Sequence, residues 1–346
     1  MKYAFLLFVF SLLITVTVNF TALRFKFLIY KPDLNHKEIF DNIILNTGGI
    51  ILFLYLIIIN IYTFTLSDIY YHLFLISIFF VGILSDIKNI NANLRLIIIS
   101  FLCFLFIILT GNEILDLKFD LINYIFINYP IIATIFTSLC LIILINGTNF
   151  VDGVHGLVIL YGIVILLFLN YFLFYTLNSN YLIQNSLEIV PVLLILLILN
   201  FREKIFFGDS GSYLLGAVIG LYIIKTCNMQ EYSYPYFYAN LLIYPAYEVF
   251  FSIFRKILTK KNPYQPDKKH LHHLIQNFYL KNYKLSLSFS KIMSATTINI
   301  VIIFFNLISV NFYQNKFILI LNIFCFAILY SVSYFILNKS DSRSFL

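Results

Sequence analysis

The chain alternates between long apolar runs and short polar stretches. The runs are about 15 to 23 residues long, which is the length that a helix needs to cross the hydrocarbon core of a bilayer. The pattern therefore predicts about eleven membrane-spanning helices. The expected spans are residues 4–22, 42–63, 69–85, 94–110, 128–146, 156–176, 187–201, 212–226, 237–254, 287–310 and 317–337.

The composition favours an all-α polytopic membrane protein. The 346 residues are 61% hydrophobic and 11% charged, far below the roughly 25% charge of soluble domains, and the mean hydropathy is +0.92. We expect residues 1–346 to form one membrane-embedded domain, with residues 255–285 as a loop at one face. The membrane is an expected partner, and nucleic acid is not.

The basic residues indicate the orientation of the bundle. With the N-terminus placed outside, 19 of the 23 Lys and Arg residues fall on the inner side. Because loops rich in Lys and Arg stay in the cytoplasm, the C-terminus and the 255–285 loop are expected to be cytoplasmic. The unusual polar stretches also fall on this side, and most glycines lie in or beside them, which favours close approach of the backbone to a ligand.

The polar stretch from Asn146 to Leu157 (NGTNFVDGVHGL) separates two apolar runs. Polar groups at a bilayer edge cost free energy unless they bind something. Asp152 has two further side chains of the kind that bind ligands, Asn149 and His155, close to it in sequence. A solvated turn would not need so many such groups. This stretch is therefore a candidate binding site.

A second polar stretch, residues 208–212 (GDSGS), precedes another apolar run. Asp and Ser at a helix start, with glycines that leave backbone N–H groups uncovered, are typical of a phosphate cradle, and the carboxylate suits a divalent cation. The alternative is an ordinary helix N-cap. The candidate residues are Gly208, Asp209, Ser210 and Gly211.

Two further carboxylates lie at the end of an apolar run or inside one. Asp86 ends a run, with Arg95 one short loop later, and is either a site residue or a solvated boundary residue. Glu248 lies inside a run, and an intramembrane carboxylate is a functional hypothesis by default. The alternative for Glu248 is an ion pair with Arg255 or Lys256, about two helical turns away.

Three of the six histidines, His270, His272 and His273, lie together in the basic 255–285 loop. Imidazoles and nearby ammonium groups suit diphosphate oxygens, because they donate hydrogen bonds and offset negative charge. A metal site is a second interpretation. A basic loop resting on anionic lipid is a third, which accounts for the lysines but not for the histidines.

Carboxylates, a phosphate cradle and cationic donors on one face indicate phosphoryl transfer with Mg²⁺, in which positioning and charge neutralisation provide most of the catalysis. A transporter is the alternative from another class. It would place its binding groups near the bilayer midplane, whereas here the polar stretches gather at one face.

These motifs resemble those of the polyprenyl-phosphate N-acetylhexosamine-1-phosphate transferases, a glycosyltransferase family 4 group. NGTNFVDGVHGL is similar to the family's N-x-x-N-x-x-D-G-x-D-G-L, FGDSGSYLLG to its G-D-x-G-S-x-x-L-G, and PYQPDKKHLHH to its P-x-x-P-D-x-x-H-L-H-H. Together with TGG at residues 47–49 they follow the family's order. Leu271 between the histidines resembles the O-antigen-initiating UDP-GlcNAc:undecaprenyl-phosphate branch, because the phospho-MurNAc-pentapeptide translocase branch has three consecutive histidines.

The resemblance implies transfer of a sugar 1-phosphate from a UDP-N-acetylhexosamine to polyprenyl phosphate, with release of UMP, at the cytoplasmic face of a bacterial inner membrane. The product would start a lipid-linked cell-envelope glycan. Mg²⁺, or Mn²⁺ in its place, is the implied cofactor, and a homodimer is left open. By position, the implied catalytic residues are Ser85, Asp86 and Asp209, the two acids also holding metal. The implied substrate-binding residues are Arg95, Asn146, Asn149, Asp152, His155, Gly208, Ser210, Gly211, Glu248, His270, His272 and His273.

Three positions depart from the family pattern. Ser85 replaces the first aspartate of a D-D pair, His155 replaces the second aspartate of D-G-x-D, and Glu248 replaces an aspartate. A phosphate monoester has a second pKa of about 6, so the lipid phosphate is mostly dianionic at neutral pH and needs little help from a base. His155 removes a negative charge near the donor and, when protonated, adds a positive one.

The departures leave one more interpretation open. In it, the chain is a family member that has lost catalysis and serves as a binding or assembly protein. The retained acids and the three histidines of the loop favour an enzyme.

Overall fold

The computed structural model describes residues 2–29, 43–63, 69–88, 90–176, 187–229, 234–260 and 269–343. Within these ranges the chain is a helical bundle with two isolated β-bridges and no strand. The helices are α1 (Lys2–Phe25), α2 (Gly48–Thr63), α3 (Ile69–Lys88), α4 (Ala92–Thr110), α5 (Asp120–Asn128), α6 (Pro130–Val151), α7 (Leu157–Thr176), α9 (Val190–Phe201), α10 (Gly208–Met229), α11 (Pro235–Leu241), α12 (Ile243–Leu258), α13 (Leu271–Asn282), α14 (Leu287–Asn311) and α15 (Lys316–Arg343).

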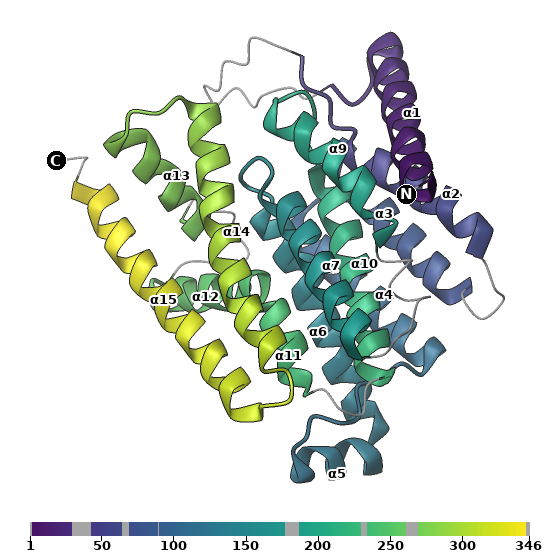
Figure 1. Ribbon diagram of the computed structural model, residues 1–346, viewed down its shortest axis with the longest axis vertical. Helices are drawn as coiled ribbons and strands as arrows, with labels where there is room; N and C mark the ends of the chain where they lie inside the picture. The colour runs from purple at the N-terminus through teal and green to yellow at the C-terminus, as the bar shows by residue number, and fades with distance from the viewer. Residues whose placement is uncertain are drawn as a thin grey trace.

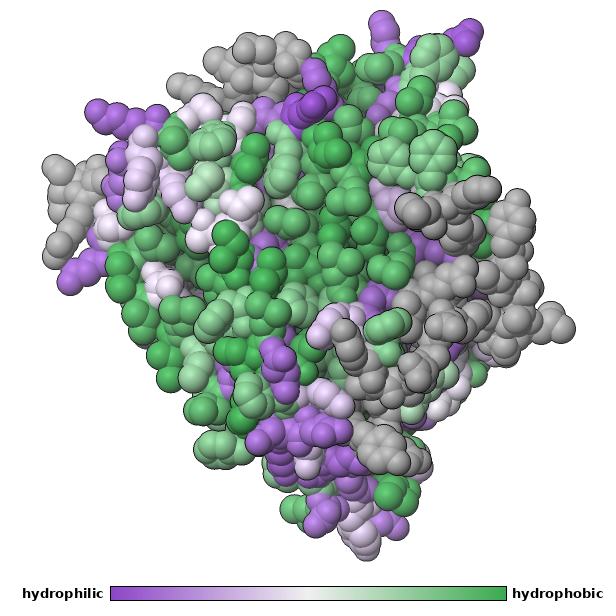
Figure 2. Space-filling view, in the orientation of Figure 1, coloured by the Kyte–Doolittle hydropathy of each residue, from purple (hydrophilic) through white to green (hydrophobic). Residues whose placement is uncertain are grey.

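The all-α polytopic membrane architecture expected from the sequence is confirmed. Eight described helices are long and apolar enough to cross a bilayer, namely α1, α3, α4, α6, α7, α10, α14 and α15. The shorter apolar helices α2 and α9 coincide with two further expected spans. Figure 2 shows hydrophobic side chains across the middle of the molecule and hydrophilic ones toward its top and bottom. The total of eleven spans and the orientation stay predictions.

Several expected spans have different boundaries in the structure, and two of them show why. The span predicted at 128–146 is the longer helix α6, which continues through the polar stretch to Val151. The span predicted at 237–254 is divided into α11 and α12 at Leu242. Pro245 lies in the first turn of α12 and has no N–H to donate back to α11, which explains the break.

Helix α10 lies in the interior of the bundle, between α12–α15 on one side and α1–α4 on the other (Figure 1). It packs against α2, α3, α6 and α7. A side-chain carbon at Gly82 of α3 would collide with the backbone of Ser210, and one at Gly216 of α10 would collide with Thr148 of α6. Small residues at such contacts let membrane helices approach closely. Close packing of helices, and not a bound ligand, therefore explains why these two positions are glycines.

The predicted 255–285 loop contains a helix of its own. Helix α13 begins directly after His270 and packs against α14 and α15. Residues 261–268, which include the predicted motif residues Pro263, Pro266 and Asp267, lie outside the described residues.

Candidate active site

The start of α10 is anchored by Asp86, which lies near the end of α3. One carboxylate oxygen of Asp86 accepts the backbone N–H of Asp209 at 2.8 Å. The other accepts the backbone N–H of Ser210 at 3.0 Å and its hydroxyl at 2.5 Å. A carboxylate bound to the free N–H groups of a helix start is a cap that the helix dipole also favours. The phosphate-cradle prediction is therefore wrong for these two N–H groups, because Asp86 already binds them.

Asp209 presents its carboxylate to polar residues from three other helices. Its Oδ2 accepts the hydroxyl of Ser85 from α3 at 2.6 Å and pairs with the guanidinium of Arg95 from α4. Its Oδ1 accepts the amide N–H of Asn149 from α6 at 2.6 Å. The side chain of Asp209 remains 27% exposed and that of Arg95 19% exposed. This group of four residues, the Asp209 cluster, is therefore ordered and still accessible to a ligand.

The turn at residues 152–156 follows α6 directly and continues the site. Gly156 adopts a φ of +78°, a region that favours glycine, and its N–H donates to Oδ1 of Asn200 at 2.5 Å. Burial, and then the negative charges of Asp209 and Asp86, raise the pKa of Asp152 well above its ordinary value. Three carboxylates thus share one neighbourhood, where a bound cation would relieve their mutual repulsion.

The three histidines of the loop lie on the other side of this turn. His272 and His273 have ring centroids 4.4 Å apart, and His270 stacks on His272 at 5.5 Å. A Cβ at Gly153 would lie 2.6 Å from Nε2 of His272 and 2.9 Å from Nε2 of His273. A side chain at this position would have to displace one of the two imidazoles, so the glycine lets the histidine cluster lie next to Asp152.

His272 is fully buried, and both of its ring nitrogens lack a hydrogen-bond partner within the described part of the chain. Burial, followed by the neighbouring His273 and His270, holds the pKa of His272 well below its ordinary value. The imidazole is therefore neutral at neutral pH. His272 therefore offers one N–H donor and one acceptor, and it adds no positive charge to the cluster.

Glu248 of α12 is buried, with 1% exposure. Its Oε1 lies 2.8 Å from Nδ1 of His270, and its Oε2 accepts the hydroxyl of Tyr330 at 2.7 Å. The functional interpretation of Glu248 gains support, because the carboxylate fixes the orientation of a candidate site histidine. The alternative, an ion pair with Arg255 or Lys256, stays a prediction beside these two contacts.

Comparison with known proteins identifies the helices that carry this arrangement. Residues 69–227 match the family described as glycosyl transferase family 4. The matched range contains α3, α4, α6 and α10, which supply the whole Asp209 cluster. The chain is thus similar to glycosyl transferase family 4 over these residues. This similarity agrees with the family expected from the sequence motifs.

Curated relatives have consistent names. The Thermotoga maritima protein named undecaprenyl-phosphate alpha-N-acetylglucosaminyl 1-phosphate transferase is 26% identical, over 66% of this chain and 66% of that protein. The Bacillus subtilis protein named probable undecaprenyl-phosphate N-acetylglucosaminyl 1-phosphate transferase is 27% identical, over 72% of this chain and 70% of that protein. The Mycolicibacterium smegmatis protein named decaprenyl-phosphate N-acetylglucosaminephosphotransferase is 29% identical, over 41% of this chain and 40% of that protein. The match spans about two thirds of the length of the first two relatives.

Ser85, a departure from the family 4 pattern, has a defined place in this chain. Its hydroxyl donates to Asp209 and accepts a hydrogen bond from Arg95 at 2.9 Å. A carboxylate at position 85 would lie against the carboxylate of Asp209, and like charges at that distance repel. Ser85 is therefore a neutral partner of Arg95, and it adds no second negative charge beside the ion pair of Arg95 with Asp209.

His155, the second departure, packs at the other end of the 152–156 turn. Its Nδ1 lies 3.5 Å from Oε1 of Glu203, and its ring meets Phe206 edge to face at 5.1 Å. Burial, and then the charge of Lys291, lower the pKa of His155 to about 3. The expectation that this imidazole adds a positive charge is wrong at neutral pH. Compared with the aspartate of the family pattern, His155 therefore only removes a negative charge from this position.

We expect the protein to lose stability between pH 7 and pH 5 because of His155. In the unfolded chain its imidazole has an ordinary pKa of about 6.5 and takes up a proton in this range. In the folded protein the pKa is about 3, so acid favours the unfolded state. At 1.5 pH units below the unfolded pKa, the loss is about 2 kcal/mol.

The test compares unfolding midpoints in detergent micelles at pH 7 and pH 5. The His155→Gln variant is expected to show a smaller difference between the two midpoints than the parent. An identical pH dependence in His155→Gln and the parent would contradict the assignment.

The Asp209 cluster fits the protein half of a Mg²⁺ site. Mg²⁺ is usually held by one or two carboxylates, with phosphate oxygens and waters completing its octahedron. Asp209 offers an accessible carboxylate, and Asp152 and Asp86 add negative charge nearby. Among the described residues no three His, Cys, Asp or Glu side chains converge on one metal position. The substrate's phosphates would therefore have to supply ligands.

The remaining predicted residues have mainly structural contacts. Asn146 donates to the carbonyl of Ile142 in its own helix at 2.9 Å. A Cβ at Gly211 would meet the ring of Phe207. These contacts are local to α6 and to the start of α10, and substrate binding at Asn146 and Gly211 stays a prediction.

Sequence reasoning missed three residues that shape the site. Asn200 of α9 holds the 152–156 turn, and the hydroxyl of Ser212 accepts a hydrogen bond from Asn149 at 3.1 Å. Asn46 has a buried Oδ1 without a hydrogen-bond partner in the described chain, close to Gly208. Each is a polar residue at the edge of an apolar run, and that signal was available in the sequence.

Proposed function

We propose that the protein transfers N-acetylglucosamine 1-phosphate from UDP-GlcNAc to polyprenyl phosphate and releases UMP. The observation that carries the proposal is the accessible carboxylate of Asp209, held by Ser85, Arg95 and Asn149 beside the histidine cluster. The names of the curated relatives support the choice of donor and acceptor. The asymmetric distribution of Lys and Arg supports a site on the cytoplasmic face of a bacterial inner membrane.

In the proposed reaction, an oxygen of the lipid phosphate attacks the β-phosphorus of UDP-GlcNAc. A new bond forms between them, and the bond from the β-phosphorus to the oxygen that bridges the two phosphates breaks. UMP leaves with that electron pair. Because the second pKa of a phosphate monoester is about 6, the attacking group is already dianionic, and no base is needed where Ser85 stands.

The chain's own residues position and neutralise the reacting phosphates. Arg95 and Asn149 hold the carboxylate of Asp209 in one orientation. His270, which Glu248 orients, and His273 beside Gly153 would donate hydrogen bonds to diphosphate oxygens. Mg²⁺, when bound at Asp209, would neutralise charge on the diphosphate as it is transferred. Electrostatic stabilisation of this kind provides most of the catalysis in phosphoryl transfer.

The test incubates the purified protein with undecaprenyl phosphate, Mg²⁺ and one of several UDP-N-acetyl sugars, and measures UMP. We expect UMP from UDP-GlcNAc when the lipid is present. EDTA should abolish the release, and Mg²⁺ or Mn²⁺ added in excess should restore it. UMP release that continues unchanged in the presence of EDTA would contradict the requirement for a divalent cation. No release by the folded protein from any donor would favour a non-catalytic family member.

A further inference from the structure

The end of α10 away from the candidate active site lies beside an apolar cavity of about 280 Å³. The cavity is bordered by α5, α6, α10, α11 and the segment between α4 and α5, at the end of the bundle from which α5 projects (Figure 1). Cys227 in its lining is about 27 Å along α10 from Asp209, at 1.5 Å per residue. Protein interiors contain few voids larger than a water molecule, so this volume indicates an occupant.

The lining is suited to a hydrocarbon chain and is open at one side. It consists of aliphatic and aromatic side chains with two cysteines, and none of the described residues that line it is charged. Phe119, Cys140 and Ala239 of the lining are exposed, whereas Leu141 and Leu144 are buried. The cavity therefore extends from the surface of the bundle into its interior, and a lipid chain can enter it from the bilayer.

A cation, Lys316 of α15, lies against two rings of this lining. Its ammonium is 3.8 Å from the ring centroid of Phe119 and 5.8 Å from that of Tyr236, and both residues line the cavity. The ammonium donates a hydrogen bond to the carbonyl of Lys118 at 3.0 Å. Because an ammonium has three N–H groups, two are left for an acceptor beside the cavity.

The charge of Lys316 has no protein anion to balance it. In the described part of the chain no carboxylate pairs with Lys316, and Asp116 is paired with Lys118 at 2.5 Å. Lys316 is also the first residue of α15, where the helix dipole disfavours a cation. Only four of the 23 Lys and Arg residues are expected on the outer side of the membrane, and two of these meet here. The arrangement is therefore complementary to an anionic group.

We propose that this site binds one anionic phospholipid, with an acyl chain in the cavity and the phosphate on the ammonium of Lys316. The chain would lie against α6, α10 and α11, and the headgroup would lie at the start of α15. One bound lipid thus connects elements that are far apart in sequence and stabilises this end of the bundle. Because the cavity and the Asp209 cluster lie toward opposite ends of α10, this lipid is not a reactant of the proposed transfer.

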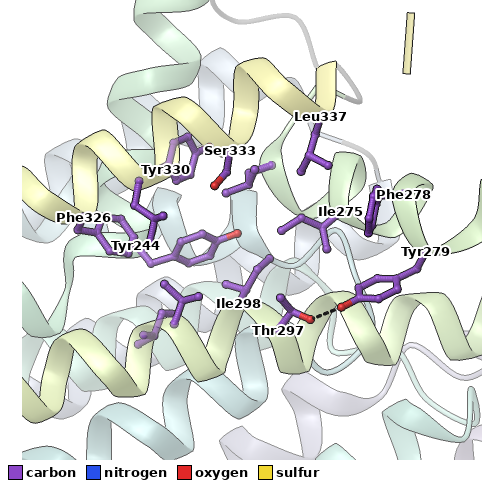
Figure 3. A pocket seen from close by; sticks show the side chains of 14 residues that line it. Tyr244, Ile275, Phe278, Tyr279, Thr297, Ile298, Phe326, Tyr330, Ser333 and Leu337 are labelled. Carbon is purple, nitrogen blue, oxygen red and sulfur yellow. Dashed lines mark hydrogen bonds between the residues drawn. The ribbon is translucent and has the colours of Figure 1, made fainter. Parts of the chain in front are cut away.

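Another apolar cavity, between α12, α13, α14 and α15, is separate from this site. Figure 3 shows its lining, in which the hydroxyls of Tyr279 and Thr297 bond to each other at 2.8 Å. Tyr330, which also lines it, donates its hydroxyl to Glu248 of the candidate active site. The two cavities share no lining residue. Binding at one can therefore be measured independently of the other.

The test measures lipid binding by native mass spectrometry of the full-length protein released from detergent micelles. Phosphatidylglycerol and phosphatidylcholine with the same acyl chains are compared at equal concentrations. We expect one phosphatidylglycerol to bind about tenfold more tightly than phosphatidylcholine, whose own cation offsets the charge that Lys316 recognises. Equal binding of the two lipids would overturn the proposal. A dimer that retains no lipid would also overturn it.

The Lys316→Gln variant removes the cation, and Lys284→Gln is its matched control. Lys284 is exposed in the segment between α13 and α14. We expect Lys316→Gln to bind phosphatidylglycerol about tenfold more weakly than the parent. Phosphatidylglycerol should raise the unfolding midpoint of the parent and of Lys284→Gln, but not that of Lys316→Gln. Unchanged phosphatidylglycerol binding by Lys316→Gln would overturn the proposal.

The Cys140→Phe variant fills the cavity from α6, and Cys325→Phe makes the same change at an exposed position of α15 that does not line the cavity. Ala239→Phe is a second filling variant, from α11, and guards against misfolding of the first. Unfolding midpoints in detergent show which variants are folded. We expect both filling variants to lose phosphatidylglycerol and Cys325→Phe to keep it. Phosphatidylglycerol that stays bound to the folded filling variants would place the lipid elsewhere and overturn the proposal.

Discussion

The Asp209→Asn variant is expected to release UMP about 10³-fold more slowly than the parent. Asp209 is the accessible carboxylate of its cluster, and its oxygens contact Ser85, Arg95 and Asn149. The amide removes the negative charge that would hold Mg²⁺ and leaves Arg95 without its anion. Losses of about 10² to 10³ follow removal of one electrostatic stabiliser in other enzymes, and here a cation site and an ion pair are lost together.

Asp116→Asn is the matched control for this loss. Asp116 pairs with Lys118 in the segment between α4 and α5, and its side chain is 50% exposed. We expect this variant to keep the parent's rate within about twofold, because exposed ion pairs contribute little. Comparable rates in Asp209→Asn and Asp116→Asn would remove Asp209 from the proposed mechanism.

The Asp86→Ala variant is expected to lose stability as well as activity. Three donors at the start of α10, the N–H groups of Asp209 and Ser210 and the hydroxyl of Ser210, would lose their acceptor. An unsatisfied buried donor costs about 1 to 3 kcal/mol. Allowing for water at the partly exposed site, the free energy of unfolding should fall by about 3 kcal/mol. The measurement is the shift of the urea or thermal unfolding midpoint in detergent.

Asp120→Ala provides the comparison for Asp86→Ala. Asp120 lies in the first turn of α5 and is exposed, at a helix start without a side-chain cap hydrogen bond. Its removal should change the free energy of unfolding by less than about 1 kcal/mol. If Asp86→Ala loses activity with an unshifted midpoint, Asp86 acts on the substrate or metal rather than as the cap of α10.

Much of the bundle follows from the sequence because the bilayer constrains it so strongly. Apolar runs of sufficient length predicted the membrane-spanning helices, and the polar stretches marked where several of these helices begin or end. The break at Leu242 was missed, although Pro245 was visible, because prolines are also tolerated inside membrane helices. Whether a helix bends or divides depends on its neighbours.

The residues of the candidate site could be named from the sequence, but the contacts between them could not. Sequence motifs brought Asp86, Asp209 and the loop histidines together as one site. They did not reveal that Asp86 caps α10, or that His270 is the partner of Glu248. These are contacts between helices far apart in sequence, and spacing along one helix carries no information about them. The buried state that keeps His155 and His272 neutral is likewise a tertiary property.

The most direct test of the account follows the β-phosphorus of the donor. The purified protein is given undecaprenyl phosphate, Mg²⁺ and UDP-GlcNAc labelled with ³²P at the β-phosphate, and the lipid fraction is separated from the nucleotides. The account predicts that the label enters the lipid as a diphosphate linked to N-acetylglucosamine, while UMP remains unlabelled, and that Asp209→Asn slows the transfer about 10³-fold. Label that stays in the nucleotide while the sugar alone moves to the lipid would contradict it.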